Sequence, residues 1–155
     1  MSTITDIVSA TGSVISALAA CVAAVGVWYA RHQLKTSREI AQLQFEDALG
    51  KEYRELAGEL SKKALMGEVL SDTEYEEAFD ELYRYVDLTN EQIGLRARGR
   101  ITPEVWRNWS EGIKANLTLP AFARAWKEIK VRSFGFEELR RIERELFKLD
   151  PKEWR

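Results

Sequence analysis

The sequence predicts an all-α protein with one N-terminal transmembrane helix followed by a bundle of about four to five helices. Three observations support this prediction. Residues 7–30 form a long run without a charged side chain. Further along, Ser71 followed by Glu74, and Thr102 followed by Pro103, are typical beginnings of helices. Apolar residues recur at three- and four-residue spacing, and no useful run alternates with the period of two expected for a strand.

The uncharged run of residues 7–30 is long enough to cross a bilayer. Its roughly 24 residues span about 36 Å as a helix, at about 1.5 Å per residue. Trp28 and Tyr29 favour the lipid headgroup level, and Arg31 begins a basic cluster. Because basic residues accumulate on the cytoplasmic side, we expect a bacterial inner-membrane protein with a periplasmic N-terminus. A cleaved signal peptide is the alternative, but no lysine or arginine precedes Arg31.

The expected organisation is therefore a transmembrane anchor at 1–32 and a cytoplasmic helical ligand-sensing domain at 33–155. Within the anchor, small residues recur at every fourth position, and these are Gly12, Ser16, Ala20 and Ala24. Small residues allow helix backbones to approach closely in a membrane, which favours self-association of several copies. The alternative is an ordinary alanine-rich anchor without a partner helix.

The remaining helices follow from local signals. We expect the first helix to continue to about residue 64, and its buried stripe comprises Leu34, Ile40, Leu43, Leu49, Tyr53, Leu56 and Leu60. A second helix runs from the Ser71 cap to near Gly99, where a glycine suits the C-terminal end. A third helix covers 103–117 and a fourth covers 120–130, each beginning with proline. Ser133 is expected to cap a fifth helix over 135–148.

Composition excludes several classes of function. The chain has a formal net charge of -2, so the whole protein is not an electrostatic binder of double-stranded nucleic acid. With one cysteine and one histidine, neither a disulfide framework nor a zinc site is expected. The sequence contains no phosphate-binding glycine loop, nucleophile elbow or metalloprotease motif. We therefore expect a protein that is not an enzyme, with no catalytic residues, metal or cofactor.

The strongest candidate ligand site lies between residues 90 and 114. Arginine forks beside a helix N-terminus suit phosphate, tryptophan faces stack on bases, and carboxamides read base edges. The expected ligand-binding residues are Asn90, Arg96, Arg98, Arg100, Trp106, Arg107 and Lys114, with Gln92, Asn108 and Trp109 as neighbours of the same chemistry. Two alternatives stay open. The arginines can form ordinary surface ion pairs, and the tryptophans match a core stripe with Ile113 and Leu117.

The segment NEQIGLRARGRITPEVWRNWSEGIKANLTLPAFARAWKEI resembles small bacterial membrane proteins that join N-terminal spans to a helical cytosolic domain. In length and layout the chain is also similar to the CRISPR-associated membrane effector that binds cyclic tetra-adenylate. That resemblance covers the architecture and includes no diagnostic motif, so no individual binding residue transfers with it. It implies a homo-oligomer that binds a cyclic oligoadenylate and then perturbs the lipid bilayer in antiviral defence. The alternative function is a non-enzymatic, membrane-anchored scaffold that recruits a protein partner.

Overall fold

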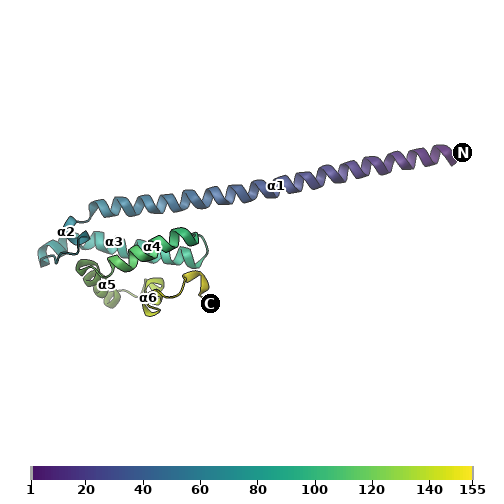
Figure 1. Cartoon of the computed structure of the whole chain (residues 1–155). Helices are drawn as coiled ribbons and strands as arrows, with labels where there is room; N and C mark the ends of the chain where they lie inside the picture. The colour runs from purple at the N-terminus through teal and green to yellow at the C-terminus, as the bar shows by residue number, and fades with distance from the viewer. Residues whose placement is uncertain (1, 155) are drawn as a thin grey trace. The chain divides into compact units, whose positions relative to one another are not determined.

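The computed structural model is all-helical in the part of the chain that it describes, namely the backbone of residues 2–154 and the side chains of residues 23–154. Its elements are α1 (Ser2–Glu59), α2 (Lys62–Leu65), α3 (Asp72–Ala97), α4 (Pro103–Asn116), α5 (Pro120–Arg132), α6 (Glu137–Arg144) and a 3-10 turn, η1 (Pro151–Glu153) (Figure 1). The prediction of an all-α fold is confirmed. The chain divides into two compact units, residues 1–43 and residues 44–155.

The first unit consists of the N-terminal part of α1. Most of the predicted span at 7–30 lies outside the residues whose side chains are described. Among those that are described, no helix is long and apolar enough to cross a membrane. The buried stripe predicted along this helix is confirmed at Leu49, Leu56 and Leu60. It was wrong at Tyr53, which is exposed in the second unit, and at Leu34, Ile40 and Leu43, which are exposed in the first. A unit made of one helix has no second element against which to bury them.

The first helix ends earlier than the sequence predicted. Glu59 is its last residue, and Ser61 then adopts an extended backbone that starts the separate short helix α2. The Ser61 hydroxyl accepts a hydrogen bond from the Ala64 backbone N–H at 3.2 Å. Serine competes well for such cap positions, so it interrupts a helical pattern that apolar spacing alone extends to residue 64.

The predicted caps of the next two helices are confirmed. The Ser71 hydroxyl accepts from the Glu74 N–H at 3.3 Å, and the Glu74 carboxylate accepts from the Ser71 N–H at 2.9 Å. This reciprocal pair is a capping box, and it begins α3. The Thr102 hydroxyl caps α4 by accepting from the Val105 N–H at 3.4 Å, and no capping box forms because the Thr102 N–H donates to Glu46 of α1. Gly99 has a φ of 69°, the left-handed conformation expected of a glycine just beyond the end of α3.

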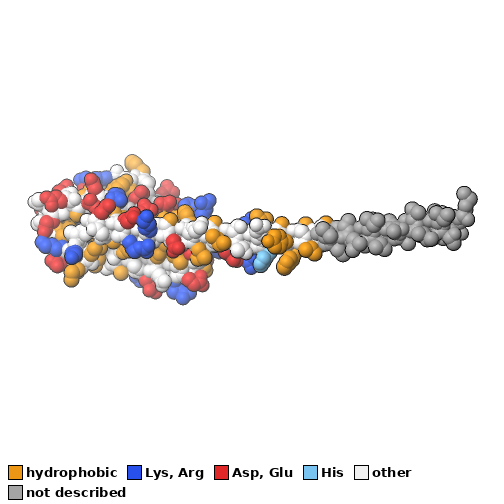
Figure 2. Space-filling view, turned by 90° about the horizontal axis from the view of Figure 1, so that it is seen from above, with side chains coloured by type: hydrophobic (Ala, Val, Ile, Leu, Met, Phe, Trp, Pro, Cys, Tyr) orange, Lys and Arg blue, Asp and Glu red, His pale blue; other side chains and the backbone are white. Residues whose placement is uncertain are grey.

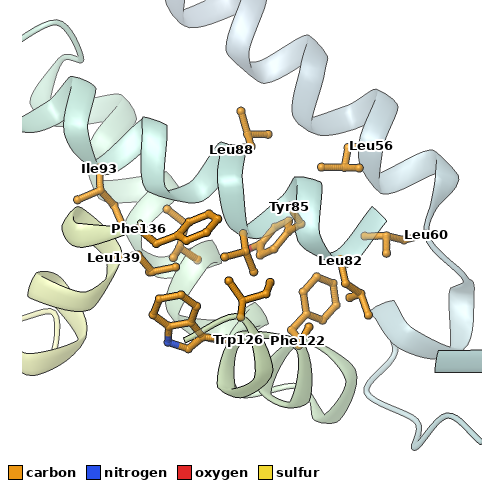
Figure 3. Close-up of a cluster of buried hydrophobic side chains, with 14 of the residues drawn as sticks. Leu56, Leu60, Leu82, Tyr85, Leu88, Ile93, Phe122, Trp126, Phe136 and Leu139 are labelled. Atoms are coloured by element: carbon orange, nitrogen blue, oxygen red, sulfur yellow. The ribbon is translucent and has the colours of Figure 1, made fainter. Parts of the chain in front are cut away.

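Helix α3 is the centre of the second unit and packs against α5, α6 and η1. Its fully buried positions include Leu82, Val86 and Ile93. Figure 3 shows the core around it, where Leu56 and Leu60 of α1 and Phe122 and Trp126 of α5 approach α3 from opposite sides. Burying such side chains stabilises the folded state by about 1.5–3 kcal/mol each before entropy is counted.

The connection between α5 and α6 differs from the prediction. Helix α6 begins at Glu137, and the residue before it, Phe136, has a left-handed φ of 64°. The ring of Phe136 is buried and packs edge-on against Tyr83 and Trp126, which compensates the strain of this conformation. Ser133 was expected to cap the helix, but its hydroxyl instead accepts from the Gly135 N–H within the turn. The helix ends at Arg144, four residues before the predicted end.

Candidate functional site

Arg96, one of the predicted ligand-binding residues, belongs to the core of the domain. Its side chain is buried, and its Nε and Nη2 atoms donate to the two oxygens of Asp150 at 2.7 and 2.5 Å. Its Nη1 atom donates to the carbonyl oxygen of Ile101 at 2.7 Å. The hydrogen bonds from Arg96 hold the pKa of the Asp150 carboxyl below its usual value. Arg96 therefore fastens η1 and the α3–α4 connection to α3.

Arg98 and Arg100 lie at the surface on either side of Gly99. Arg98 follows the last residue of α3, and its guanidinium lies back over Gly94. A methyl group added at Gly94 would meet the Arg98 Nη1 atom at 3.1 Å, so the glycine leaves room for this arrangement. Both arginines are accessible to a ligand, but neither lines the cavity described below.

The other four predicted residues do not converge on one receptor. The Asn90 Oδ1 atom accepts from the Leu139 backbone N–H at 3.1 Å, which ties α3 to α6. Trp106 is 6% exposed and belongs to the core, as the core alternative predicted. Arg107 and Lys114 are exposed on α4. In the anchor, Gly12, Ser16 and Ala20 lie outside the described side chains, and Ala24 is exposed.

A cavity of about 230 Å³ lies in the second unit between the C-terminal part of α1, the middle of α3, and α4. It is smaller than the pockets that hold drug-sized ligands, so its volume suits a single ring system. Three helices supply its lining, which comprises Gly50, Tyr53, Arg54, Tyr85, Leu88, Thr89, Gln92, Asn108, Trp109, Gly112, Ile113 and Asn116. Three of the residues that the sequence singled out for base recognition, Gln92, Asn108 and Trp109, thus share one cavity.

The lining of this cavity includes buried residues of α3 with polar side chains. Gln92 is 5% exposed, and its carboxamide forms no hydrogen bond with any residue that the structure describes. Among the described residues no buried polar side-chain atom lacks a hydrogen-bond partner, so the Gln92 carboxamide reaches solvent in the cavity, where a ligand can contact it. The Tyr85 hydroxyl accepts from the Asn116 Nδ2 atom at 3.0 Å. Burial raises the pKa of Tyr85 to about 12, so its phenol stays protonated and can also donate.

The outer part of the cavity combines an apolar wall with one positive charge. Leu88 and Ile113 are buried, and the half-buried ring of Trp109 lies beside them. Arg54 is exposed at the rim and makes no ion pair with a described residue. The site therefore offers an aromatic face, several carboxamides and one free guanidinium. That set suits a planar heterocycle with polar edges that is attached to an anion.

Sequence reasoning missed Tyr53, Arg54 and Asn116. Gly50, Tyr53 and Arg54 stand at positions i, i+3 and i+4 of α1, so the helical period puts them on one face. This spacing could have grouped the three residues, but nothing local connects them to α4, more than 50 residues away. Among the described residues, no group of three or more histidine, cysteine or acidic side chains could hold a metal ion.

No family model matches the chain, and comparisons with curated proteins and with solved structures find no match.

Proposed function

We propose that the protein is a membrane effector whose helical domain senses a nucleotide second messenger in the cavity between α1, α3 and α4. The single observation behind this proposal is that the side chains of Gln92, Trp109 and Arg54 line one cavity. Stacking on an aromatic face contributes about 1–3 kcal/mol per base, and a carboxamide can pair with a base edge. The guanidinium of Arg54 supplies the partner for a phosphate.

The volume of the cavity and its single rim arginine favour a cyclic oligonucleotide made of repeated units. Each chain offers space for one base and one unpaired rim arginine, hence one nucleotide per subunit. A ring of identical subunits can offer the same pair of contacts to each nucleotide of a symmetric ligand. We therefore propose a homo-oligomer that binds a cyclic oligoadenylate, with Gln92 and Asn108 reading the base edges.

The membrane part of the proposal is an anchor at residues 7–30, which the uncharged sequence supports. Helix α1 runs without interruption from Ser2 to Glu59, so the residues that line the cavity from α1 belong to the same helix as the proposed span. A ligand that prefers one packing of α1 would bias how the spans associate. The resulting damage to the inner membrane would serve antiviral defence, with the domain in the cytoplasm.

The decisive experiment fills the cavity without removing a core side chain. A Cβ built on Gly112 meets no atom within 4 Å, so Gly112→Leu has room to occupy the cavity. Gly58→Leu is the matched control, because Gly58 also faces open space on a helix but does not line the cavity. Both variants should fold at least as well as the parent, since leucine favours a helix over glycine by about 0.5–1 kcal/mol.

The measurement is a titration of the full chain in detergent with cyclic tetra-adenylate. Gly112→Leu should abolish binding, and Gly58→Leu should leave it unchanged. Arg54→Gln should weaken binding about tenfold, as expected for one exposed charge-assisted contact, and the loss should shrink as salt rises. Binding that survives both Gly112→Leu and Arg54→Gln would remove the cavity from the proposal and leave Arg98 and Arg100 as the remaining phosphate receptors.

Coupling to the membrane requires a separate experiment in cells. Several Gly-Ser residues inserted after Lys35 would replace a continuous helix by a flexible joint. Ligand binding should survive this insertion, while ligand-dependent depolarisation should be lost. The same insertion after Gly67, in a turn with a φ of 78°, tests for general damage to the domain. If the variant with the insertion after Lys35 depolarises the membrane and remains as toxic as the parent, clustering of the spans is sufficient to damage the membrane and no rotation is transmitted along α1.

A protein scaffold is the second candidate function, and the surface of α3 favours it. Glu76, Asp80, Asp87 and Glu91 are exposed at spacings of four and seven residues, which puts them on one side of the helix. None of the four forms an ion pair with a described residue, whereas basic and acidic side chains are interspersed over the domain face shown in Figure 2. A protein partner with a basic groove should bind to the parent chain and should fail to bind when these four charges are reversed. Cyclic tetra-adenylate should not compete with that partner.

A further inference from the structure

The turn between α5 and α6 exposes large apolar side chains at its tip. Val131 is 83% exposed and Phe134 is 102% exposed, as open to water as a side chain in an extended peptide. Single exposed apolar residues are common, but a fully exposed phenylalanine on a turn leaves the largest such surface of the domain without a contact. Removing both side chains from water would release a substantial hydrophobic free energy.

The turn that carries this tip is held in one shape by Arg140. The Arg140 Nη2 atom donates to the carbonyl oxygens of Lys130 at 2.8 Å and Ser133 at 2.6 Å. Its Nε atom donates to the carbonyl of Gly135 at 3.0 Å. Three carbonyls bound by one guanidinium fix the path of the chain, so Phe134 is presented to solvent by an ordered turn. An ordered turn pays little additional entropy when its tip becomes buried.

A basic groove of about 630 Å³ adjoins the same tip. Lys130, Arg140, Arg141 and Arg144 line it, with Glu137 as its only lining carboxylate in the described structure. Arg144 is exposed and forms neither a hydrogen bond nor an ion pair with a described residue. Lys130 forms an ion pair with Glu143, and Arg141 forms one with Glu145. Arg140 binds the three carbonyls of the turn, so Arg144 is the guanidinium of the groove that is left to bind an anionic group.

We propose that this turn docks on the surface of an anionic phospholipid bilayer. Val131 and Phe134 enter the interfacial region, and the basic groove binds a headgroup phosphate beside them. The shape of the tip selects this occupant. A projecting, fully exposed ring fits a fluid surface that deforms around it, whereas a folded protein would need a matching hollow. The proposal does not depend on nucleotide binding or on the anchor at residues 7–30.

The test places a fluorophore at the tip of the full chain. In a Cys21→Ala background, Phe134→Cys is labelled with an environment-sensitive probe and mixed with or reconstituted into vesicles. One set of vesicles contains phosphatidylcholine alone, and the other contains phosphatidylserine as well. Quenching by spin-labelled lipid then reports contact of position 134 with acyl chains. Val69→Cys is the matched control, because Val69 is 81% exposed on another turn and does not line the basic groove.

The label at 134 should be quenched in the phosphatidylserine vesicles and much less in phosphatidylcholine alone, while the label at 69 stays in water in both. Arg144→Gln should reduce the ratio of docked to free turn about fivefold, the effect of one cation near an anionic surface. Lys62→Gln, which changes a charge elsewhere, should leave that ratio unchanged. Equal quenching at 134 and 69, or in both lipid mixtures, would overturn the proposal. So would shielding of the label from water without quenching by lipid, because a protein surface would then cover the tip.

Discussion

Replacing Asp150 by alanine should destabilise the domain more than any other single change at its surface. Asp150 is the only described carboxylate bonded to the Arg96 guanidinium, whose side chain is 4% exposed against 28% for Asp150. The substitution leaves Arg96 charged, buried and bonded only to the Ile101 carbonyl. Breaking a buried ion pair from one side costs about 3–5 kcal/mol.

The expected cost is somewhat smaller here, because water can reach the space that Asp150 leaves. We expect a loss of about 2–3 kcal/mol in the free energy of unfolding. For a domain of this size that corresponds to a melting temperature lower by roughly 8–12 °C, which circular dichroism of the full chain in detergent can follow. Glu153→Ala is the control, because Glu153 is exposed in the same 3-10 turn and should change stability by less than about 0.5 kcal/mol.

The pH dependence gives a second readout of the same pair. Arg96 holds the folded-state pKa of Asp150 below the value near 3.9 that an unfolded aspartate has. The unfolded chain therefore takes up a proton first as pH falls. The stabilisation is complete above about pH 5 and is lost as pH falls through the lowered pKa. Asp150→Asn should remove this part of the acid dependence. If Asp150→Ala melts with the parent, the pair makes no net contribution and the reasoning fails.

Three further predictions concern other parts of the domain. Trp106→Ala should cost about 3–5 kcal/mol because the ring is buried, measured as a lower denaturant midpoint; an unchanged midpoint would return Trp106 to the list of ligand residues. Glu46→Ala should cost about 1–3 kcal/mol, since this buried carboxylate accepts the Thr102 N–H at 2.5 Å, and Glu46→Gln should recover part of it. Burial raises the pKa of Tyr85 to about 12, so the protonated phenol stabilises the folded state, and this stabilisation should be lost as pH rises from about 10 toward 12. Tyr85→Phe should remove this part of the pH dependence from melting curves recorded at alkaline pH.

Helix beginnings were predictable from the sequence because their signals are local. Ser71 and Glu74 satisfy each other's backbone groups within four residues, and the Thr102 hydroxyl accepts from the Val105 N–H three residues on. The end of α1 was less predictable, because Ser61 breaks a pattern of apolar residues that continues beyond it. The left-handed Phe136 had no local signal at all. Its conformation is compensated by ring contacts with Tyr83 and Trp126, which only the folded structure brings together.

Sequence reasoning named three of the residues that line the cavity but could not place the cavity itself. Gln92 and Asn108 carry carboxamides and Trp109 carries an indole ring, and the structure brings these three together. Arg96 was expected to bind a phosphate, but its partner Asp150 is 54 residues away in the chain. A sequence pattern cannot distinguish an arginine that binds a ligand from one that forms an ion pair with a carboxylate distant in the chain. Arg54 was missed for the same reason, because its relation to α4 exists only after folding.

The bond between Arg96 and Asp150 also determines when the domain can be completed during synthesis. Its partners are 54 residues apart, so at about 5–20 residues per second a ribosome needs roughly 3–11 s to supply Asp150 after Arg96. Throughout that interval the face of α3 that η1 later covers remains open, with a charged guanidinium among apolar side chains. The nascent domain therefore stays incompletely folded until residues 150 and 151 have been synthesised. During this interval a chaperone or a neighbouring chain can bind the uncovered face of α3.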